Sequence, residues 1–171
     1  MVESNQTAKQ LAAAEKEERH IEVWKIKRLI KKLQSARGNG TSFVSFYIPP
    51  KNAIGGVMNH LNQELAGAEN IKNRQTRQSV ISAITSTRER LKLYKAIPEN
   101  GLAIFCGVIL MEDNKTEKKV TYDLVPYKPL HANVYKCQNT FYTEPLLALL
   151  EDDEKFGFIV MDGNGVLFAT L

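Results

Sequence analysis

The chain has 171 residues, of which 43% are hydrophobic and 25% charged, and its formal net charge is +4. This length and apolar content suffice for one sizeable core, which excludes a fibre and a mostly disordered chain. The positive charge is compatible with an anionic partner such as RNA but does not require one. The sequence has no run of about 18 apolar residues, so no membrane partner is expected.

Residues 1–18 are polar and mixed in charge. We expect a flexible N-terminal tail here, either disordered or a frayed extension of the next helix. The segment lacks the basic and apolar regions of a signal peptide. The two cysteines are Cys106, inside an apolar run, and Cys137. This usage is typical of a reducing compartment, so we expect a cytoplasmic protein.

An amphipathic helix with one basic side is predicted over residues 21–36 and ends at Gly38. Its apolar positions are Val23, Ile26, Leu29, Ile30 and Leu33. Its basic positions are Lys25, Lys27, Arg28, Lys31 and Lys32. A strand rich in aromatic and β-branched residues follows over residues 42–48 and stops at Pro49.

Two long helical patterns come next, separated by residues 67–73. Their apolar positions are Ile54, Val57, Met58, Leu61 and Leu65 in the first and Val80, Ile81, Ile84, Leu91 and Tyr94 in the second. The segment between them therefore forms the tip of a helical hairpin.

After Pro98 the pattern changes mainly to strands. The expected segments are strands at 102–110 and 120–125 with a charged turn at 112–119 between them, a polar segment at 135–141, a short helix at 144–150, and a hairpin of strands at 156–161 and 166–171. This order predicts an α/β sandwich with a mostly antiparallel or mixed sheet packed by helices, including the long helical hairpin.

Motifs for metal binding or catalysis are missing from the sequence. The histidines His20, His60 and His131 lie far apart, and none has the spacing of zinc ligands. Gly163-Asn164-Gly165 stands between two strands, which indicates a turn rather than a phosphate-binding loop. We therefore expect no cofactor, no metal and no enzymatic activity from this chain alone.

Cations gather where the hairpin tip meets its second helix. Lys72, Arg74 and Arg77 lie beside a helix N-terminus, a position that favours phosphate. Asn70 and Asn73 offer a donor and an acceptor to base edges, or else cap that helix. The tip is a candidate RNA-binding site in which both roles of the asparagines stay open.

The polar segment 135–141 holds a second group of candidates. Tyr135 and Phe141 could stack on splayed bases, as in proteins that read single-stranded RNA, or Phe141 could pack under the loop. Cys137 shares the face of Tyr135 if the segment is extended, and could pack or donate weakly. The hydroxyls of Thr41-Ser42 could bond adenine or guanine, or cap the entry to the strand.

Three short motifs occur in the order and spacing of one protein family. They are Gly40-Thr41-Ser42, Asn70-Ile71-Lys72-Asn73 and Tyr135-Lys136-Cys137-Gln138-Asn139-Thr140-Phe141. The second resembles the Asn-Ile-Lys-Ser motif, and the third matches Tyr-x-Cys-x-x-x-Phe. Residues 19–171 therefore resemble the N-terminal, stop-codon recognition domain of eukaryotic class-1 release factors.

The resemblance implies recognition of mRNA stop codons in the decoding centre of the small ribosomal subunit, in contact with its rRNA. It assigns codon reading to the three motifs, and it matches Glu64 to a position implicated in reading the first uridine. The alternative for Glu64, on an exposed helix face, is a solvated glutamate. Lys72 corresponds to a family lysine that can be hydroxylated. Release itself belongs to a separate Gly-Gly-Gln domain, and the full-length factor works with a class-2 release factor GTPase.

The hydrolytic motif is absent here because Gly55-Gly56 is followed by Val57. The chain also stops at Leu171 inside an apolar strand. We therefore expect a fragment of a longer multidomain factor. The alternative function is that of a ribosome rescue or surveillance factor, which binds a stalled ribosome without reading a codon; such relatives should lack the Asn-Ile-Lys hairpin and the Tyr-x-Cys loop.

Departures from the family pattern fall in the reading motifs. Asn73 replaces the usual Ser, Gln138 replaces an acidic residue, Ala132-Asn133 replaces a Thr-Ser pair, and Glu69 adds a negative charge beside the tip. Amides in place of hydroxyls change donor geometry, and a carboxylate near RNA is repulsive. The hypothesis is a restricted or altered set of stop codons, as in organisms with a variant genetic code, ciliates among them. The alternative is neutral drift.

Overall fold

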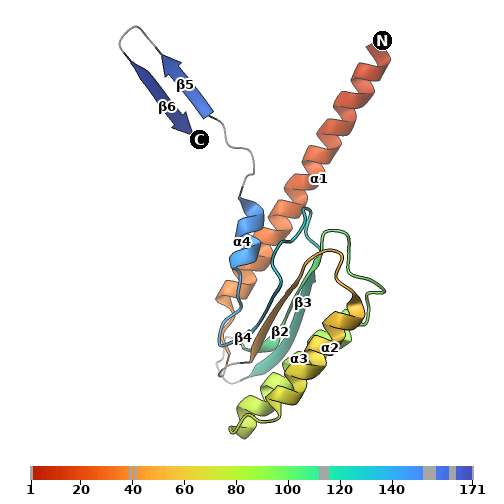
Figure 1. Cartoon of the computed structure of the whole chain (residues 1–171), viewed down its shortest axis with the longest axis vertical. Coiled ribbons are helices and arrows are strands. Elements are labelled where there is room, and N and C mark those ends of the chain that lie inside the picture. Colours follow the sequence, from red (N-terminus) through yellow and green to blue (C-terminus); the bar gives the residue numbers. More distant parts are fainter. Residues whose placement is uncertain are drawn as a thin grey trace.

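The computed structural model describes residues 2–38, 40, 42–111, 116–151, 157–161 and 165–170 (Figure 1). Its elements in chain order are α1 Val2–Ser35, β1 Phe43–Ile48, α2 Ile54–Ala68, α3 Arg74–Leu91, β2 Leu102–Leu110, β3 Glu117–Leu124, β4 Val134–Gln138, α4 Glu144–Leu150, β5 Gly157–Met161 and β6 Val166–Thr170. None of the helices in these ranges is long and apolar enough to cross a membrane.

Strand β1 lies inside a four-stranded sheet of order β3-β2-β1-β4, in which each neighbouring pair is antiparallel. All six residues of β1 are buried, and five of them are aromatic or aliphatic, as is typical of a strand covered on both faces. Strands β5 and β6 form a separate antiparallel pair with Met161 opposite Val166, which confirms the predicted hairpin. Its turn, 162–164, lies outside the described residues.

Successive side chains of β1 face opposite layers of helices, which gives the predicted α/β sandwich (Figure 1). Val44, Phe46 and Ile48 belong to the core under α2 and α3. Phe43 and Tyr47 belong to the core under α1 and α4.

Helix α1 contributes Ile26, Ile30 and Leu33 to the second of these cores, at 0%, 5% and 1% exposure. Burying each of these side chains stabilises the fold by about 1.5–3 kcal/mol. Between Ile26 and Leu33, the apolar face of α1 is therefore buried against the sheet, and the opposite side of the helix is left to solvent.

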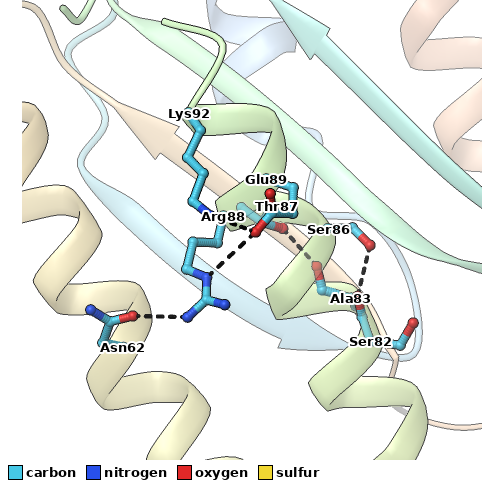
Figure 2. Close-up of polar contacts among 8 residues, drawn as sticks. All are labelled: Asn62, Ser82, Ala83, Ser86, Thr87, Arg88, Glu89 and Lys92. Carbon is cyan, nitrogen blue, oxygen red and sulfur yellow. Dashed lines mark hydrogen bonds and ion pairs between the residues drawn. The ribbon is translucent and has the colours of Figure 1, made fainter. Parts of the chain in front are cut away.

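A polar contact joins the two hairpin helices, and ion pairs within α3 lie beside it (Figure 2). Arg88 Nη1 on α3 donates to Asn62 Oδ1 on α2 at 3.3 Å. Glu89 Oε1 lies 2.8 Å from Lys92 Nζ and 4.0 Å from Arg88 Nε. Arg90 Nη2 ties α3 to the sheet through Asp123 Oδ1 at 2.5 Å. The base of the hairpin is thus fixed on the sheet while its tip extends beyond it.

Three features differ from the sequence expectations. Helix α1 begins at Val2, so the helical alternative for residues 1–18 agrees with the structure, whereas their flexibility stays a prediction. Strand β3 begins at Glu117 rather than at 120 because it pairs with the whole length of β2, with Glu117 opposite Leu110. The polar segment from residue 135 contains strand β4, which its mixed composition concealed.

Candidate nucleic-acid interface

Three candidate segments meet at one end of the sheet. Phe43 pairs with Gln138, which places the loop before β1 beside the loop after β4. Gly40 has a φ of +86°, and a Cβ there would lie 3.9 Å from Thr76 Oγ1 in the first turn of α3. The hairpin tip projects past this same end (Figure 1). The fold therefore gathers segments that are far apart in sequence.

A pocket of about 370 Å³ lies between α2, the hairpin tip and β4. It brings together four residues predicted from sequence: Glu64, Ile71, Tyr135 and Cys137. The remaining lining residues are Gln63, Gly67, Ala68, Val80 and Ile84. Since Ile84 and Val80 belong to the core, the pocket has an apolar floor and a polar wall.

Tyr135 places a half-buried phenol in this pocket. Its ring lies edge-on to Phe46, with centroids 5.6 Å apart, and 5.6 Å from the ring of His60. Its hydroxyl is buried without a hydrogen-bond partner among the described residues. Burial raises the pKa of Tyr135 well above its usual range, so the group remains a neutral donor. A bound polar atom would satisfy this hydroxyl.

Cys137 lies on the same face as Tyr135, as an extended segment predicts, since both pack against the core under the hairpin. Burial, with a smaller contribution from the Glu64 carboxylate, raises the pKa of Cys137 to about 11. The thiol is therefore neutral near pH 7. The structure records no disulfide for Cys137 or Cys106.

Glu64 is only half-exposed and lines the pocket, so it is more than a solvated helix residue. Its Oε1 lies 3.7 Å from His60 Nε2, one helical turn earlier. The sequence motifs do not place His60 at the RNA site. Its spacing of four residues from Glu64 was the signal for this pairing.

Two side chains on the α3 side of the hairpin tip make hydrogen bonds to the backbone. Asn73 Oδ1 accepts a hydrogen bond from Thr76 N at 2.9 Å, so Asn73 caps α3 and the capping interpretation is right for this residue. Arg77 Nη1 donates to the carbonyl of Ile71 at 3.3 Å and braces the turn. Within the described part of the chain, the exposed side chains of Asn70, Lys72 and Arg74 make no recorded hydrogen bond or ion pair.

Phe141 is only 6% exposed, which favours its packing alternative over stacking on a base, while its part in codon reading stays a prediction. Its ring lies parallel to that of Phe43, with centroids 4.4 Å apart, on the α1 side of the sheet. Phe141 therefore holds the loop in place, as its packing alternative predicted. Ser42 is 1% exposed, so its side chain is also not at the surface. Asn139 is exposed, and Thr41 lies outside the described residues.

The described residues contain no cluster of three or more His, Cys, Asp or Glu side chains able to hold a metal. The geometry instead provides a polar pocket beside exposed cations and amides. Such an arrangement suits recognition of a base by donors and acceptors, with nearby cations on the phosphates.

Solved structures with the same fold include an archaeal translation termination factor. A chain titled "Crystal structure of archaeal translation termination factor, aRF1" aligns with a TM-score of 0.68 at 30% identity, over 87% of this chain and 41% of that one. Another chain, titled "Archaeal protein", aligns with a TM-score of 0.71, also at 30% identity, over 87% of this chain and 41% of that one.

The family model for eRF1 domain 1 matches residues 21–151, and this chain belongs to that family. "Eukaryotic peptide chain release factor subunit 1" of Stylonychia lemnae is 61% identical over 153 residues, which are 90% of this chain and 34% of the relative. The protein of the same name from Podospora anserina is 56% identical over 158 residues, 92% and 36% of the two chains. The chain spans about a third of the length of these relatives.

Proposed function

We propose that this chain is the part of a translation termination factor that reads mRNA stop codons in the ribosomal decoding centre. The observation that carries the proposal is the pocket in which Glu64, Tyr135 and Cys137 meet beside the exposed Lys72. The names of the relatives favour termination over rescue of a stalled ribosome.

The pocket and the tip have different tasks in this proposal. Lys72 and Arg74, exposed beside the N-terminus of α3, attract the phosphates of the message. Glu64 offers an acceptor, and the Tyr135 hydroxyl a donor, to a base edge. Each good contact discriminates by about 1–3 kcal/mol, so several must act together to reject sense codons.

Hydrolysis is assigned to a separate Gly-Gly-Gln domain of the full-length factor, and the class-2 release factor GTPase and decoding-centre rRNA are its expected partners. The expected location is the cytoplasm, where translation takes place. Lys72 is exposed, so a hydroxylating enzyme would have access to it.

A restricted set of stop codons remains a prediction. The geometry reduces the number of substituted residues that could cause it. Asn73 caps α3 through its side chain, and Ser in this position caps a helix equally well. The exchange of Ser for Asn is thus explained by local structure. Any restriction is therefore assigned to the remaining departures: Gln138, exposed at the end of β4, Glu69 at the tip, and Ala132-Asn133 just before β4.

The test joins this chain to the remaining domains of a conventional release factor. Peptide release is measured on ribosomes programmed with UAA, UAG, UGA or the sense codon UGG. Release at one or more stop codons, with none at UGG, is the expected result. A folded fusion that binds ribosomes and yet releases peptide at no stop codon would overturn the proposal.

A reversal variant tests the restriction. If fewer than three stop codons support release, a variant that combines Gln138→Glu, Glu69→Ala, Ala132→Thr and Asn133→Ser is expected to restore the others, because it removes these three departures. Asn73→Ser is the matched control and should leave the set of codons unchanged. Restoration by Asn73→Ser alone would contradict the assignment.

A further inference from the structure

The solvent side of α1, on the face of the sheet away from the pocket, is strongly basic. No acidic residue occurs between Glu22 and Glu64. The cations in that interval are Lys25, Lys27, Arg28, Lys31, Lys32, Arg37 and Lys51. Because Ile26, Ile30 and Leu33 occupy the buried side of α1, the exposed cations Lys27, Arg28, Lys31 and Lys32 form a basic outer surface.

An exposed aromatic ring lies among these cations. Trp24 is 58% exposed, and the Arg28 guanidinium lies over its ring at 5.2 Å from the centroid. A hollow of about 600 Å³ is lined by Trp24, Lys27, Arg28, Lys31, Lys32 and Ser35. We call these six residues the α1 surface. A second hollow of about 500 Å³ shares Lys32 and Ser35 with it and continues toward Arg37 and Tyr122.

Little negative charge offsets these cations. Glu22 is paired with Lys25 at 2.6 Å, and the other acidic residues of α1, namely Glu3, Glu15, Glu17 and Glu18, lie further toward the N-terminus. Lys27, Lys31 and Lys32 make no ion pair with the described residues. Because an α-helix rises about 1.5 Å per residue, cations four residues apart lie about 6 Å apart along the axis. The result is a row of positive charge beside an aromatic ring.

We infer that the α1 surface binds the phosphate backbone of structured RNA, separately from the codon pocket. The row of cations complements a polyanion, and stacking on Trp24 holds Arg28 in place, so less side-chain entropy is lost on binding. The choice of RNA among polyanions rests on the proposed function, which places the domain against rRNA. An anionic membrane fits less well, because the apolar face that such a helix would insert is buried in the core.

This surface contributes affinity without reading sequence. Phosphate contacts position a protein on RNA and make its binding depend on salt, whereas base contacts specify the site. The sheet and its two cores lie between the α1 surface and the codon pocket. The domain would then contact RNA on both sides, at the codon pocket on one face of the sheet and at the α1 surface on the other.

Trp24 is the only tryptophan of the chain, so it reports directly on this surface. The probe is an RNA stem-loop that contains no stop triplet, titrated into the whole chain while Trp24 emission is recorded. A change in Trp24 emission that saturates, and that 0.5 M salt abolishes, is expected. RNA that binds by anisotropy of a label without altering Trp24 emission would overturn the inference.

A pair of matched variants measures the contribution of the cations. Lys27→Gln with Lys31→Gln is compared with Lys51→Gln and Lys95→Gln, which removes the same charge at exposed positions elsewhere. The first pair should weaken binding about tenfold at low salt and lower the slope of log K against log salt by roughly 1–2, whereas the second should have little effect. Equal losses in both pairs would show only a general effect of net charge and would overturn the inference.

Two further experiments distinguish binding of RNA from binding of other polyanions, and binding at the α1 surface from binding at the codon pocket. Phosphatidylserine vesicles or polyglutamate that bind as tightly as the stem-loop would overturn the choice of RNA. Lys72→Gln with Arg74→Gln should leave the Trp24 response unchanged while weakening release in the fusion assay. A fusion inactive at every stop codon, with the Trp24 response intact, would refute the proposed function and leave this surface standing.

Discussion

The two faces of the sheet present different chemistry to solvent. Under the hairpin, the packing leaves a pocket in which a carboxylate, a phenol and a thiol are partly buried. On the α1 side, Ile26, Ile30 and Leu33 are buried in the core, and the cations of the α1 surface line a hollow on the outside of the helix. Discrimination between bases needs desolvated groups in fixed positions, while affinity for phosphate needs exposed cations. The comparison assigns codon specificity to the pocket face, and to the α1 face an affinity that depends on salt but not on the codon.

The largest expected effect concerns the core on the α1 side. Phe141→Ala removes the ring stacked on Phe43 and should lower the free energy of unfolding by about 3–5 kcal/mol. Urea unfolding measures the change, and Leu147→Ala, at an exposed apolar position on α4, is the control. If Phe141→Ala keeps its stability and loses only codon reading, the ring belongs to the reading face after all.

Tyr135→Phe tests the pocket without disturbing its shape. Removing a buried hydroxyl that has no partner should leave stability unchanged or raise it by about 1 kcal/mol. Release at stop codons relative to UGG should nevertheless fall about 10- to 100-fold, as the loss of one good contact predicts. A clear loss of stability, with codon discrimination intact, would make Tyr135 a structural residue.

The hairpin tip should lose stability when its cap is removed. Asn73→Ala is expected to lower the free energy of unfolding by about 1 kcal/mol, and Asn73→Ser by only a few tenths. Asn70→Ala is the neighbouring control, because its exposed side chain caps nothing. Equal effects of the two alanine variants would contradict the assigned cap.

The smallest effect is the titration of Cys137, whose pKa is raised from its usual 9.0 to about 11. Its contribution to stability is complete below pH 9 and is lost as the pH rises toward 11, because the unfolded chain releases this proton first. Alkylation followed by peptide mass spectrometry should give an apparent pKa near 11. Glu64→Gln should lower this apparent pKa, and Glu69→Gln should leave it unchanged. Equal pH profiles of alkylation in the two variants would show that the Glu64 carboxylate does not act on the thiol.

The sequence predicted most helices and strands because their apolar residues recur at the helical or strand period. It concealed β4, since Tyr135 and Cys137 alternate there with Lys136 and Gln138, and such a run also suits a loop. The pocket could not be predicted from the residues alone, because it depends on how α2 lies against β4. The sequence could not decide between capping and base contact for Asn73, or between packing and stacking for Phe141, because each role depends on the geometry of the neighbouring residues.

The division between the two faces is tested most directly by release from the fusion protein over a range of salt concentrations, at stop codons and at UGG. Tyr135→Phe should reduce the ratio of stop to UGG release at every salt concentration. Lys27→Gln with Lys31→Gln should instead raise the concentration of factor needed for half-maximal release, most strongly at low salt, and leave that ratio unchanged. A change of codon ratio in the α1 variant, or a change only of affinity in the pocket variant, would contradict the account.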